Sequence, residues 1–369
     1  MKIAILHYEF QSERGAERTM YEVAKGLKEK GHVVAVFTLS ASGRYYNRFD
    51  VLNIPLYYLL TRKLSLLEKE PPRLHHVKLA KQVNAWEPDV VLSSHSSTIW
   101  CLPFIKAPVV HYAHENGSRY TTEPYFRSLS RHWLASCWSP FRRALDKYIV
   151  KRHVTTLVQN SNYSAERGYL EYGVFSEVVY PGFNPDVFHP YDVPRGDYIV
   201  SVGTCHPYKG FQDIVMALSK LENAPRFVLV SKCDNHDWFG RTLYSLGIRN
   251  GVRIIWKENL SDKALAELYS GALCYVQTAV MEPFGLTAIE AQACGCPVVA
   301  YNEAGARENV IYGTLTTRHN LSRAIKDTIH YTQGKCVCKE NMYERMIAQF
   351  NWKNSIEKLD TVIRSAVEE

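Results

Sequence analysis

The sequence predicts an α/β fold with two domains, each built on a doubly wound parallel sheet. Short apolar runs alternate with amphipathic segments along almost the whole chain. The apolar runs do not alternate strictly with polar residues, which is typical of parallel strands buried on both faces. A length of 369 residues fits two domains of ordinary size. Ligands of such sheets bind beyond the carboxyl ends of the strands, so we expect the site in a cleft between the domains.

The first domain is expected to begin with a buried strand, MKIAILHYEF. An amphipathic helix then spans residues 15–31, because its apolar side chains recur at helical spacing, and Gly31 is placed to end it. The following apolar runs predict further strands at residues 32–39, 89–96, 107–115, 155–161 and 177–182.

A segment rich in Pro, Asp and Gly at residues 185–196 separates two alternating series and marks the domain boundary. We therefore predict domains at 1–188 and 189–351, with a last amphipathic helix over 352–369 that packs back on the first domain. In the second domain, Ser261 is expected to cap a helix. Another helix follows Lys209, and strands are predicted at 197–204, 226–232, 252–258, 273–278 and 297–301.

Composition indicates a globular, water-soluble protein, with 46% hydrophobic and 22% charged residues. The amino terminus lacks the long apolar stretch of a signal peptide, and no apolar window is long enough to cross a bilayer. The nine cysteines are scattered without the paired spacing of a zinc site, so we expect free thiols in a reducing compartment. A cytoplasmic location follows from these observations.

Residues 127–153 combine basic and aromatic side chains, a composition typical of a membrane-surface contact. We expect this segment to touch an anionic membrane peripherally, and a plain solvated helix face is the alternative. Nucleic acid is not expected as a partner, because no recognition motif accompanies the charge. The residues concerned are Arg127, Arg131, Trp133, Trp138, Phe141, Arg142, Arg143, Lys147, Tyr148, Lys151 and Arg152.

The most informative segment is EPFGLTAIEAQACGCPVVAY, in which Glu282 and Glu290 stand eight positions apart. It predicts a loop that leads into a helix N-terminus beside a buried strand. Such a terminus presents unpaired backbone N–H groups and a positive dipole end, which suit a phosphate. Glu290 would lie in the second turn, where a carboxylate can accept hydrogen bonds from a ribose diol. A simple capping arrangement is the alternative.

Several segments occur in a characteristic order: ERGAER, YAHEN, VQNSNYSAERG, VYPGFNPDVF, VGTCHPYKGF, LAELYSGA, EPFGLTAIEAQACGCPVVA and FNWKNSIEKL. Together they resemble the retaining glycosyltransferases of family 4, which have the GT-B fold of two facing Rossmann-like domains. The resemblance extends over nearly the whole chain. The YAHEN and NSNYS segments are similar to mannosyltransferases that build lipid-linked glycans.

The resemblance implies roles for the residues around the helix N-terminus. Glu290 corresponds to the glutamate that holds the nucleotide ribose hydroxyls, and Glu282 to the one that hydrogen-bonds the donor sugar. Backbone N–H groups would face the diphosphate and the sugar at Phe284, Gly285 and Leu286.

The remaining implied site residues come from other loops. Lys209 corresponds to the lysine that neutralises the leaving diphosphate, with Gly203 and Thr204 on the same donor-binding loop. His114 corresponds to the histidine at the sugar end of the cleft, and Gly15 to the glycine loop after the first strand. Plainer interpretations exist: a strand-end core histidine, a loop glycine, and a solvated lysine at a helix start, although that end disfavours cations.

The sequence departs from the family pattern at two loops. Family members usually carry an arginine near the lysine, but Thr204 and Tyr208 occupy those positions. The first loop usually has two adjacent glycines, but Arg14 precedes Gly15. The basic residues Arg14, Lys232 and Arg307 are the candidates to replace the missing cation.

The resemblance implies transfer of a hexose from a GDP- or UDP-linked sugar to a hydroxyl of a glycan or lipid-linked acceptor, with retention at the anomeric carbon. No metal and no other cofactor are expected, because Lys209 and helix N–H groups would take the metal's place and no Asp-x-Asp element occurs. A non-catalytic nucleotide-sugar-binding GT-B protein and a nucleotide-sugar epimerase are the alternatives. A dinucleotide oxidoreductase is disfavoured, because no G-x-G-x-x-G follows the first strand.

Overall fold

The computed structural model describes residues 1–11, 15–60, 74–114, 133–231, 238–334 and 339–368. The chain forms two compact units, Met1–Gly182 with Trp352–Glu369, and Phe183–Asn351. The division comes slightly before the predicted boundary after residue 188. The reason is that Phe183 N–H donates to the carbonyl of Phe350 at 3.2 Å and the Tyr343 hydroxyl to that of Pro185 at 3.1 Å, so this connecting strand is bound to the second unit.

The first unit contains a seven-stranded sheet in the order β3-β2-β1-β4-β5-β6-β7, and each neighbouring pair is parallel. The order runs outward in both directions from the β1–β4 pair, where Ile3 lies opposite Val90. The strands are β1 (Lys2–Phe10), β2 (Val33–Ala41), β3 (Leu56–Leu60), β4 (Val90–Ser94), β5 (Val109–Ala113), β6 (Thr156–Gln159) and β7 (Ser176–Val178).

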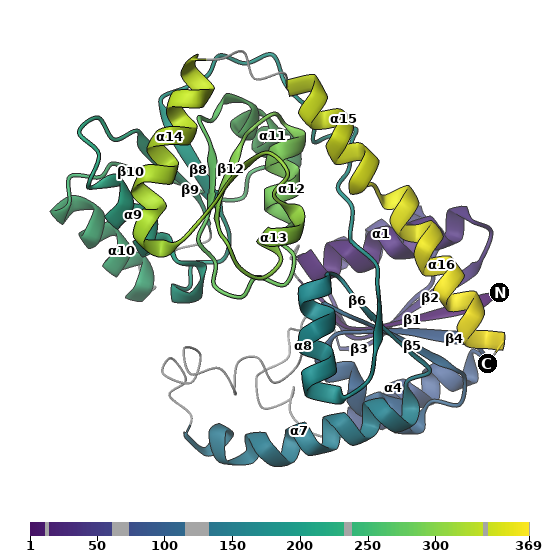
Figure 1. The fold of residues 1–369 in the computed structure, drawn as a ribbon. Coiled ribbons are helices and arrows are strands. Elements are labelled where there is room, and N and C mark those ends of the chain that lie inside the picture. Colours follow the sequence, from purple (N-terminus) through teal and green to yellow (C-terminus); the bar gives the residue numbers. More distant parts are fainter. Residues whose placement is uncertain (12–14, 61–73, 115–132, 232–237, 335–338, 369) are drawn as a thin grey trace. The chain divides into compact units, whose positions relative to one another are not determined.

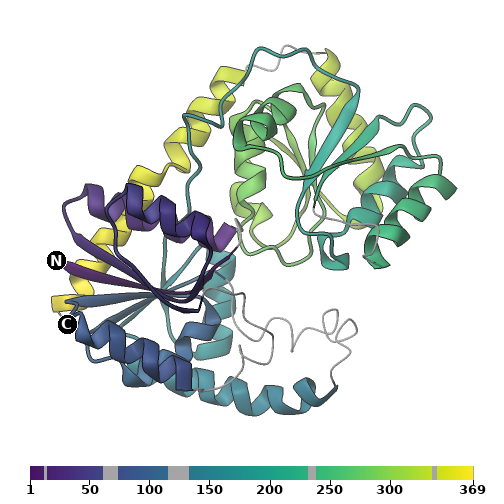
Figure 2. The same cartoon turned by 180° about the vertical axis from the view of Figure 1, so that it is seen from behind.

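Helices cover both faces of this sheet (Figures 1 and 2). One core joins the sheet to α1 (Gly15–Glu29), α2 (Gly43–Val51) and α16 (Trp352–Glu368). The other joins it to α4 (Leu74–Ala85), α7 (Trp133–His153), α8 (Asn162–Tyr172) and the 3₁₀ segment η1 (Ser96–Phe104). Both faces of the central strands are therefore buried, which explains why apolar residues in them do not alternate strictly with polar ones.

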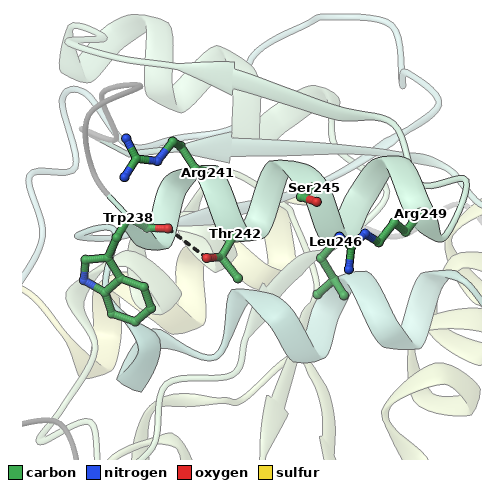
Figure 3. Close-up of a pocket in the computed structure, with 6 residues that line it drawn as sticks. All are labelled: Trp238, Arg241, Thr242, Ser245, Leu246 and Arg249. Atoms are coloured by element: carbon green, nitrogen blue, oxygen red, sulfur yellow. Dashed lines mark hydrogen bonds between the residues drawn. The ribbon is translucent and has the colours of Figure 1, made fainter.

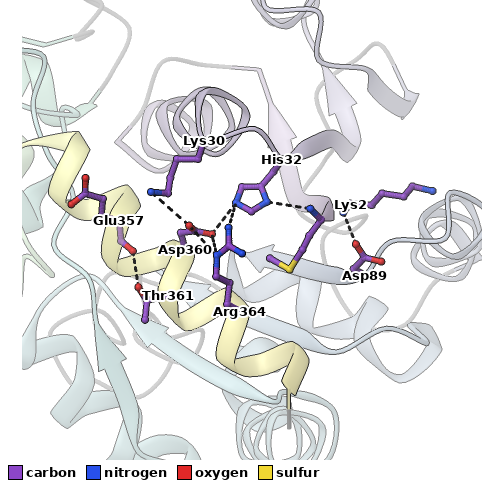
Figure 4. A network of polar contacts seen from close by, with 9 residues as sticks. Lys2, Lys30, His32, Asp89, Glu357, Asp360, Thr361 and Arg364 are labelled. Atoms are coloured by element: carbon purple, nitrogen blue, oxygen red, sulfur yellow. Dashed lines mark hydrogen bonds and ion pairs between the residues drawn. The ribbon is translucent and has the colours of Figure 1, made fainter.

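A buried polar network fastens the carboxyl-terminal helix α16 to this unit (Figure 4). Asp360 Oδ1 lies 2.8 Å from His32 Nε2, within hydrogen-bonding distance. The same carboxylate forms ion pairs with Arg364 at 3.2 Å and with Lys30 at 3.7 Å. The amino-terminal group of Met1 lies 3.5 Å from His32 Nδ1. Asp360 is only 6% exposed, so these partners provide the contacts that water would otherwise make to its carboxylate.

The second unit repeats the same topology with six parallel strands in the order β10-β9-β8-β11-β12-β13. The order reverses between β8 and β11, where Val200 lies opposite Tyr275. The strands are β8 (Tyr198–Val202), β9 (Arg226–Val230), β10 (Ile254–Lys257), β11 (Tyr275–Gln277), β12 (Val298–Tyr301) and β13 (Gly313–Thr316). The predicted fold class, two doubly wound parallel sheets, is confirmed.

Helices again flank the sheet on both sides (Figure 1). The core of one face contains α9 (Phe211–Leu218), α10 (Trp238–Arg249) and α14 (Leu321–Gly334). The other helical elements are η2 (Pro207–Lys209), α11 (Asp262–Gly271), α12 (Leu286–Ala293), α13 (Ala306–Asn309), η3 (Arg318–Asn320) and α15 (Lys339–Gln349). The Ser261 hydroxyl accepts the Ala264 N–H at 3.2 Å, so the predicted cap of α11 is confirmed.

The thiol prediction is confirmed in part. Four cysteines are buried free thiols: Cys101, Cys274, Cys294 and Cys296. For Cys205 the prediction is wrong, because this residue is disulfide-bonded. Spacing in the sequence could not reveal this bond, because disulfide formation depends on the distance between residues in the folded chain.

Candidate functional site

The second unit places its candidate residues at the point where the strand order reverses. Loops that follow β8 and β11 leave the sheet side by side at its carboxyl edge, because these two parallel strands are neighbours. This is the position at which doubly wound sheets bind their ligands. The first loop carries Gly203, Thr204 and Lys209, and the second carries Glu282 and leads into α12.

The two loops are tied together through their backbones. The Thr278 hydroxyl donates to the carbonyl of Lys209 at 3.0 Å, and Val280 N–H donates to that of Tyr208, also at 3.0 Å. Between them, Gly210 has a φ of +71°, and a Cβ atom there would lie 2.3 Å from the carbonyl oxygen of Thr278. Only glycine permits this approach.

Lys209 and Glu282 meet at the centre of this arrangement. Lys209 Nζ lies 2.6 Å from Glu282 Oε2, and the two side chains are 18% and 21% exposed. The pair is therefore accessible to a ligand while being partly withdrawn from water, which strengthens charge-assisted hydrogen bonds. The aliphatic stem of Lys209 lies above Gly203, where a Cβ atom would be 3.4 Å from its Cδ.

The backbone before Glu282 is strained. Met281 has a φ of +58°, a conformation that a non-glycine residue rarely adopts. Gly305 N–H donates to the carbonyl of Glu282 at 3.0 Å and holds the turn in place. Strain that the surroundings maintain is frequent where a side chain must be aimed at a ligand.

The helix α12 begins at this loop without a side-chain cap. Its N-cap is Gly285, which has a φ of +94°, and Leu286 is the first helical residue. The first N–H groups of a helix lack partners within the helix, so this end offers donors and a positive dipole to an anion. The Phe284 side chain is buried against Phe350, with ring centroids 5.6 Å apart, so only its backbone can serve a ligand.

Glu290 lies one turn further along the same helix and is 2% exposed. Burial, and after it the charge of Glu290, raise the pKa of Tyr269 well above its ordinary value. The neighbouring Thr287 hydroxyl lies 2.7 Å from that of Tyr275. Glu290 thus occupies the second helical turn, as the spacing of the two glutamates predicts.

Two supporting residues were missed in the sequence. Asn309 Nδ2 donates to the carbonyls of Phe284 and Gly285, which fixes the loop before α12. Gln292 is fully buried, and its side-chain NH₂ donates to the carbonyl of Asn309 at 2.8 Å. Its side-chain oxygen accepts hydrogen bonds from the backbone N–H groups of Ile311 and Tyr312, both at 2.8 Å. A polar amide amid the apolar run AQACGCPVV was the available signal for Gln292.

The first unit gathers histidines at its own point of strand-order reversal. His114 follows β5, His7 lies on β1, and His95 follows β4 with a φ of +89°. Burial, and then the neighbouring His95 and His111, lower the pKa of His114 to about 3, so its imidazole is neutral at pH 7. Within the described part of the chain, His114 Nε2 and His7 Nδ1 are buried without a hydrogen-bond partner.

Of the other predicted positions, Gly15 and Arg307 lie within the described residues and two do not. Gly15 is the exposed first residue of α1, and its carbonyl accepts from the Thr19 hydroxyl at 2.8 Å. Arg307 donates to the carbonyl of Asn302 at 3.1 and 2.9 Å. Arg14 and Lys232 lie outside the described residues.

In the basic and aromatic segment, the structure describes side chains only from residue 140 onward. The predictions for Arg127, Arg131, Trp133 and Trp138 therefore lie outside the described side chains. On α7, Phe141 and Tyr148 are 57% and 62% exposed. They stand seven residues apart and so share a helix face.

A pocket on the second unit is lined by none of the candidate site residues (Figure 3). Its lining comes from α10 alone: Trp238, Arg241, Thr242, Ser245, Leu246 and Arg249. In the part of the chain that is described, no helix is long and apolar enough to span a membrane. The same residues contain no cluster of three His, Cys, Asp or Glu side chains arranged to hold a metal ion.

Comparison with known proteins places both units in glycosyltransferase families. Residues 14–187 match the model of glycosyltransferase family 4, and residues 192–332 match that of glycosyl transferases group 1. The two matches follow one another and cover most of the chain. They correspond to the first and second units.

Curated relatives include the D-inositol 3-phosphate glycosyltransferases of Mycobacterium tuberculosis and Mycobacterium bovis. The sequences are 30% identical over 216 residues, which is 52% of this chain and 44% of each relative. The chain therefore matches less than half of the length of these relatives.

Solved structures show the same fold. Anabaena HepE in complex with UDP-glucose has a TM-score of 0.78 at 19% identity. This match covers 98% of the present chain and 99% of the HepE chain. Sucrose-phosphate synthase from Thermosynechococcus elongatus has a TM-score of 0.80 at 20% identity. This match covers 99% of the present chain and 98% of the synthase chain. With two matching family models and two Rossmann-like units, the chain belongs to glycosyltransferase family 4 and has the GT-B fold.

Proposed function

We propose that the protein transfers a hexose from a nucleoside diphosphate sugar, GDP- or UDP-linked, to a hydroxyl of a glycan or lipid-linked acceptor, with retention at the anomeric carbon. The observation that carries this proposal is the Lys209–Glu282 pair beside the uncapped start of α12. The group 1 family match spans both residues.

The donor's diphosphate would bind at the N–H groups of Gly285 and Leu286 and at the Lys209 ammonium. The Glu290 carboxylate, in the second turn, would accept the ribose hydroxyls. When the bond between the sugar and the diphosphate breaks, negative charge grows on the leaving group, and donors already fixed in place stabilise it without reorganising. Glu282 would exchange part of its contact with Lys209 for a hydroxyl of the donor sugar.

His114 would serve as a neutral hydrogen-bonding partner for the sugar. Its lowered pKa keeps the ring uncharged, and its buried Nε2 has no partner among the described residues. A neutral imidazole can donate from one nitrogen and accept at the other, which suits a hydroxyl group. Gly15, at the start of α1, would allow a ligand to approach the backbone closely.

Metal independence is part of the proposal, because Lys209 and the helix N–H groups would neutralise the phosphates in place of a metal ion. Chelation with EDTA should leave the rate of donor consumption unchanged. A loss of activity that added Mg²⁺ or Mn²⁺ restores would contradict this part.

The first test is a thermal-shift screen of the protein with UDP, GDP and their sugars. A ligand at 100 times its Kd adds about 2.7 kcal/mol of stability, which is readily detected. Release of nucleoside diphosphate from the best donor is then measured for the wild type, Glu282→Ala and Lys209→Ala. Each substitution should slow release by about 100-fold or more. Lys263→Ala, an exposed lysine on α11, is the matched control.

Unchanged turnover in both Glu282→Ala and Lys209→Ala would overturn the proposed function. Tight nucleotide binding without release from any donor would instead support a non-catalytic binding protein. Retention is read by NMR from the anomeric configuration of the glycoside formed on the acceptor, which should be α when the donor is α-linked.

Peripheral contact with an anionic membrane also belongs to the proposal. Exposed apolar side chains on α7 are accompanied by Lys147 and Lys151, whose ends come within 3.5–3.6 Å of a Cβ atom built on Gly173. Phe175, two residues later, is 82% exposed, so aromatic and basic groups share one surface. Such a combination binds anionic headgroups and inserts rings at the interface.

Vesicle sedimentation tests this contact. Vesicles with phosphatidylglycerol should bind the protein more strongly than pure phosphatidylcholine vesicles, and the double variant Lys147→Glu, Lys151→Glu should lose the difference. The control is Lys326→Glu on α14. Equal binding of the wild type to both kinds of vesicle would contradict the contact.

A further inference from the structure

The loop that follows β8 in the second unit, residues 203–210, has little positive charge of its own. Its one lysine, Lys209, already contacts Glu282 at 2.6 Å, and the buried Glu290 adds a second carboxylate to the same region. A nucleoside diphosphate brings several negative charges. Uncharged hydrogen-bond donors are therefore needed near the ammonium to bind it.

Tyr208 and Thr204 supply hydroxyl groups at this loop. Tyr208 Oη lies 3.2 Å from Thr204 Oγ1, and either atom can be the donor. Thr204 is exposed and Tyr208 is half-buried, so a ligand can reach both. A hydroxyl rotates about its C–O bond and can redirect its proton to a new acceptor.

The position of the Tyr208 ring is fixed from several sides. Lys209 Nζ lies 5.3 Å from the ring centroid, a cation–π distance. The His206 ring is 4.6 Å away, and the Tyr208 carbonyl accepts Val280 N–H from the neighbouring loop. The Tyr208 ring is consequently held near the ammonium, and its hydroxyl is held against Thr204, instead of sampling many positions.

We propose that the Tyr208 and Thr204 hydroxyls bind the diphosphate of the donor directly and take the place of a second cation. This inference rests on the proposed function, because it assumes a nucleoside diphosphate at the Lys209 loop. It assigns to Tyr208 a specificity role, since a hydroxyl pair recognises the phosphates and not the nucleoside.

Calorimetric titration tests the assignment with the full-length protein. The ligands are UDP or GDP, whichever the wild type binds more tightly, and the corresponding nucleoside. Tyr208→Phe retains the ring and its packing, and should weaken diphosphate binding by about tenfold or more, the loss expected for one hydrogen bond to a charged group. Nucleoside affinity should not change. Tyr244→Phe, an exposed tyrosine on α10, is the control and should bind as the wild type does.

Thr204→Val provides an independent variant, because it removes the partner hydroxyl without touching the ring. Its effect and that of Tyr208→Phe should combine to less than the product of the single effects, since the two groups are in contact. Unchanged diphosphate affinity in Tyr208→Phe, or an equal loss for the nucleoside, would overturn the inference.

The outcomes separate this inference from the function on which it rests. If Lys209→Ala weakens diphosphate binding while Tyr208→Phe does not, the hydroxyl role is wrong and the donor site stands. If Lys209→Ala leaves diphosphate binding unchanged, the donor site itself is wrong.

Discussion

Replacing Gly210 by alanine tests how the two loops of the second unit are joined. The added Cβ would lie 2.3 Å from the carbonyl oxygen of Thr278 and 2.9 Å from its Cβ, closer than atoms can approach without movement. The residue also has a φ of +71°, where a side chain costs about 1–2 kcal/mol. Crowding in a packed region adds about 1–3 kcal/mol. Together we expect a destabilisation of about 2–5 kcal/mol.

A matched control separates these two contributions. Gly251 has a φ of +67°, but a Cβ atom there would have nothing within 4 Å. Gly251→Ala should therefore cost only the conformational part, about 1–2 kcal/mol. The difference between the two variants measures the close approach of the loops.

Hydrogen exchange of the amides in β8 and β11 is a suitable assay, because their protection reports the free energy of opening of the second unit. Gly210→Ala should lower that protection by more than Gly251→Ala does, and should also weaken nucleotide binding, since Lys209 would move. If Gly210→Ala costs no more than the control, the loops are not held by this contact and the reasoning is wrong.

Two further predictions concern the first unit. Asp360→Asn should destabilise the first unit by about 1–3 kcal/mol in a urea titration, because His32 loses the carboxylate that lies 2.8 Å away. The control is Glu357→Gln on the exposed side of α16, which should change the stability by less than about 0.5 kcal/mol. The pKa values of His111 and His114 are lowered to about 3 by burial, so below the unfolded value of 6.5 only the unfolded chain takes up these protons. The free energy of unfolding should fall as the pH decreases from 6.5, by about 1.4 kcal/mol per pH unit for each histidine. His111→Gln should reduce that slope. An unchanged slope would show that the His111 ring is not neutral in the folded protein.

Much of the fold could be predicted because its central strands are buried on both faces. The runs at 3–6, 33–37 and 298–301 are wholly apolar, and a parallel sheet is the arrangement that buries such strands. Two of the edge strands, β3 and β13, were not predicted. Both β3, LYYLL, and β13, GTLT, are short and partly exposed, so neither shows a burial pattern that separates a strand from a loop.

For the candidate site, the sequence predicted the loop, the helix start and the place of Glu290 within the helix. It could not predict that Glu282 contacts Lys209, because 73 residues separate them and only the neighbouring positions of β8 and β11 bring their loops together. The histidines of the first unit are a similar case. His7, His95 and His114 lie on or directly after different strands, and the lowered pKa values of His7 and His114 depend on burial that no local pattern reveals.

A crystal structure with bound UDP or GDP tests the central claim most directly. We predict the ribose hydroxyls within hydrogen-bonding distance of the Glu290 carboxylate, with the diphosphate at the start of α12 and against the Lys209 ammonium. A nucleotide bound away from the carboxyl ends of β8 and β11, with Lys209 still paired to Glu282, would contradict the account.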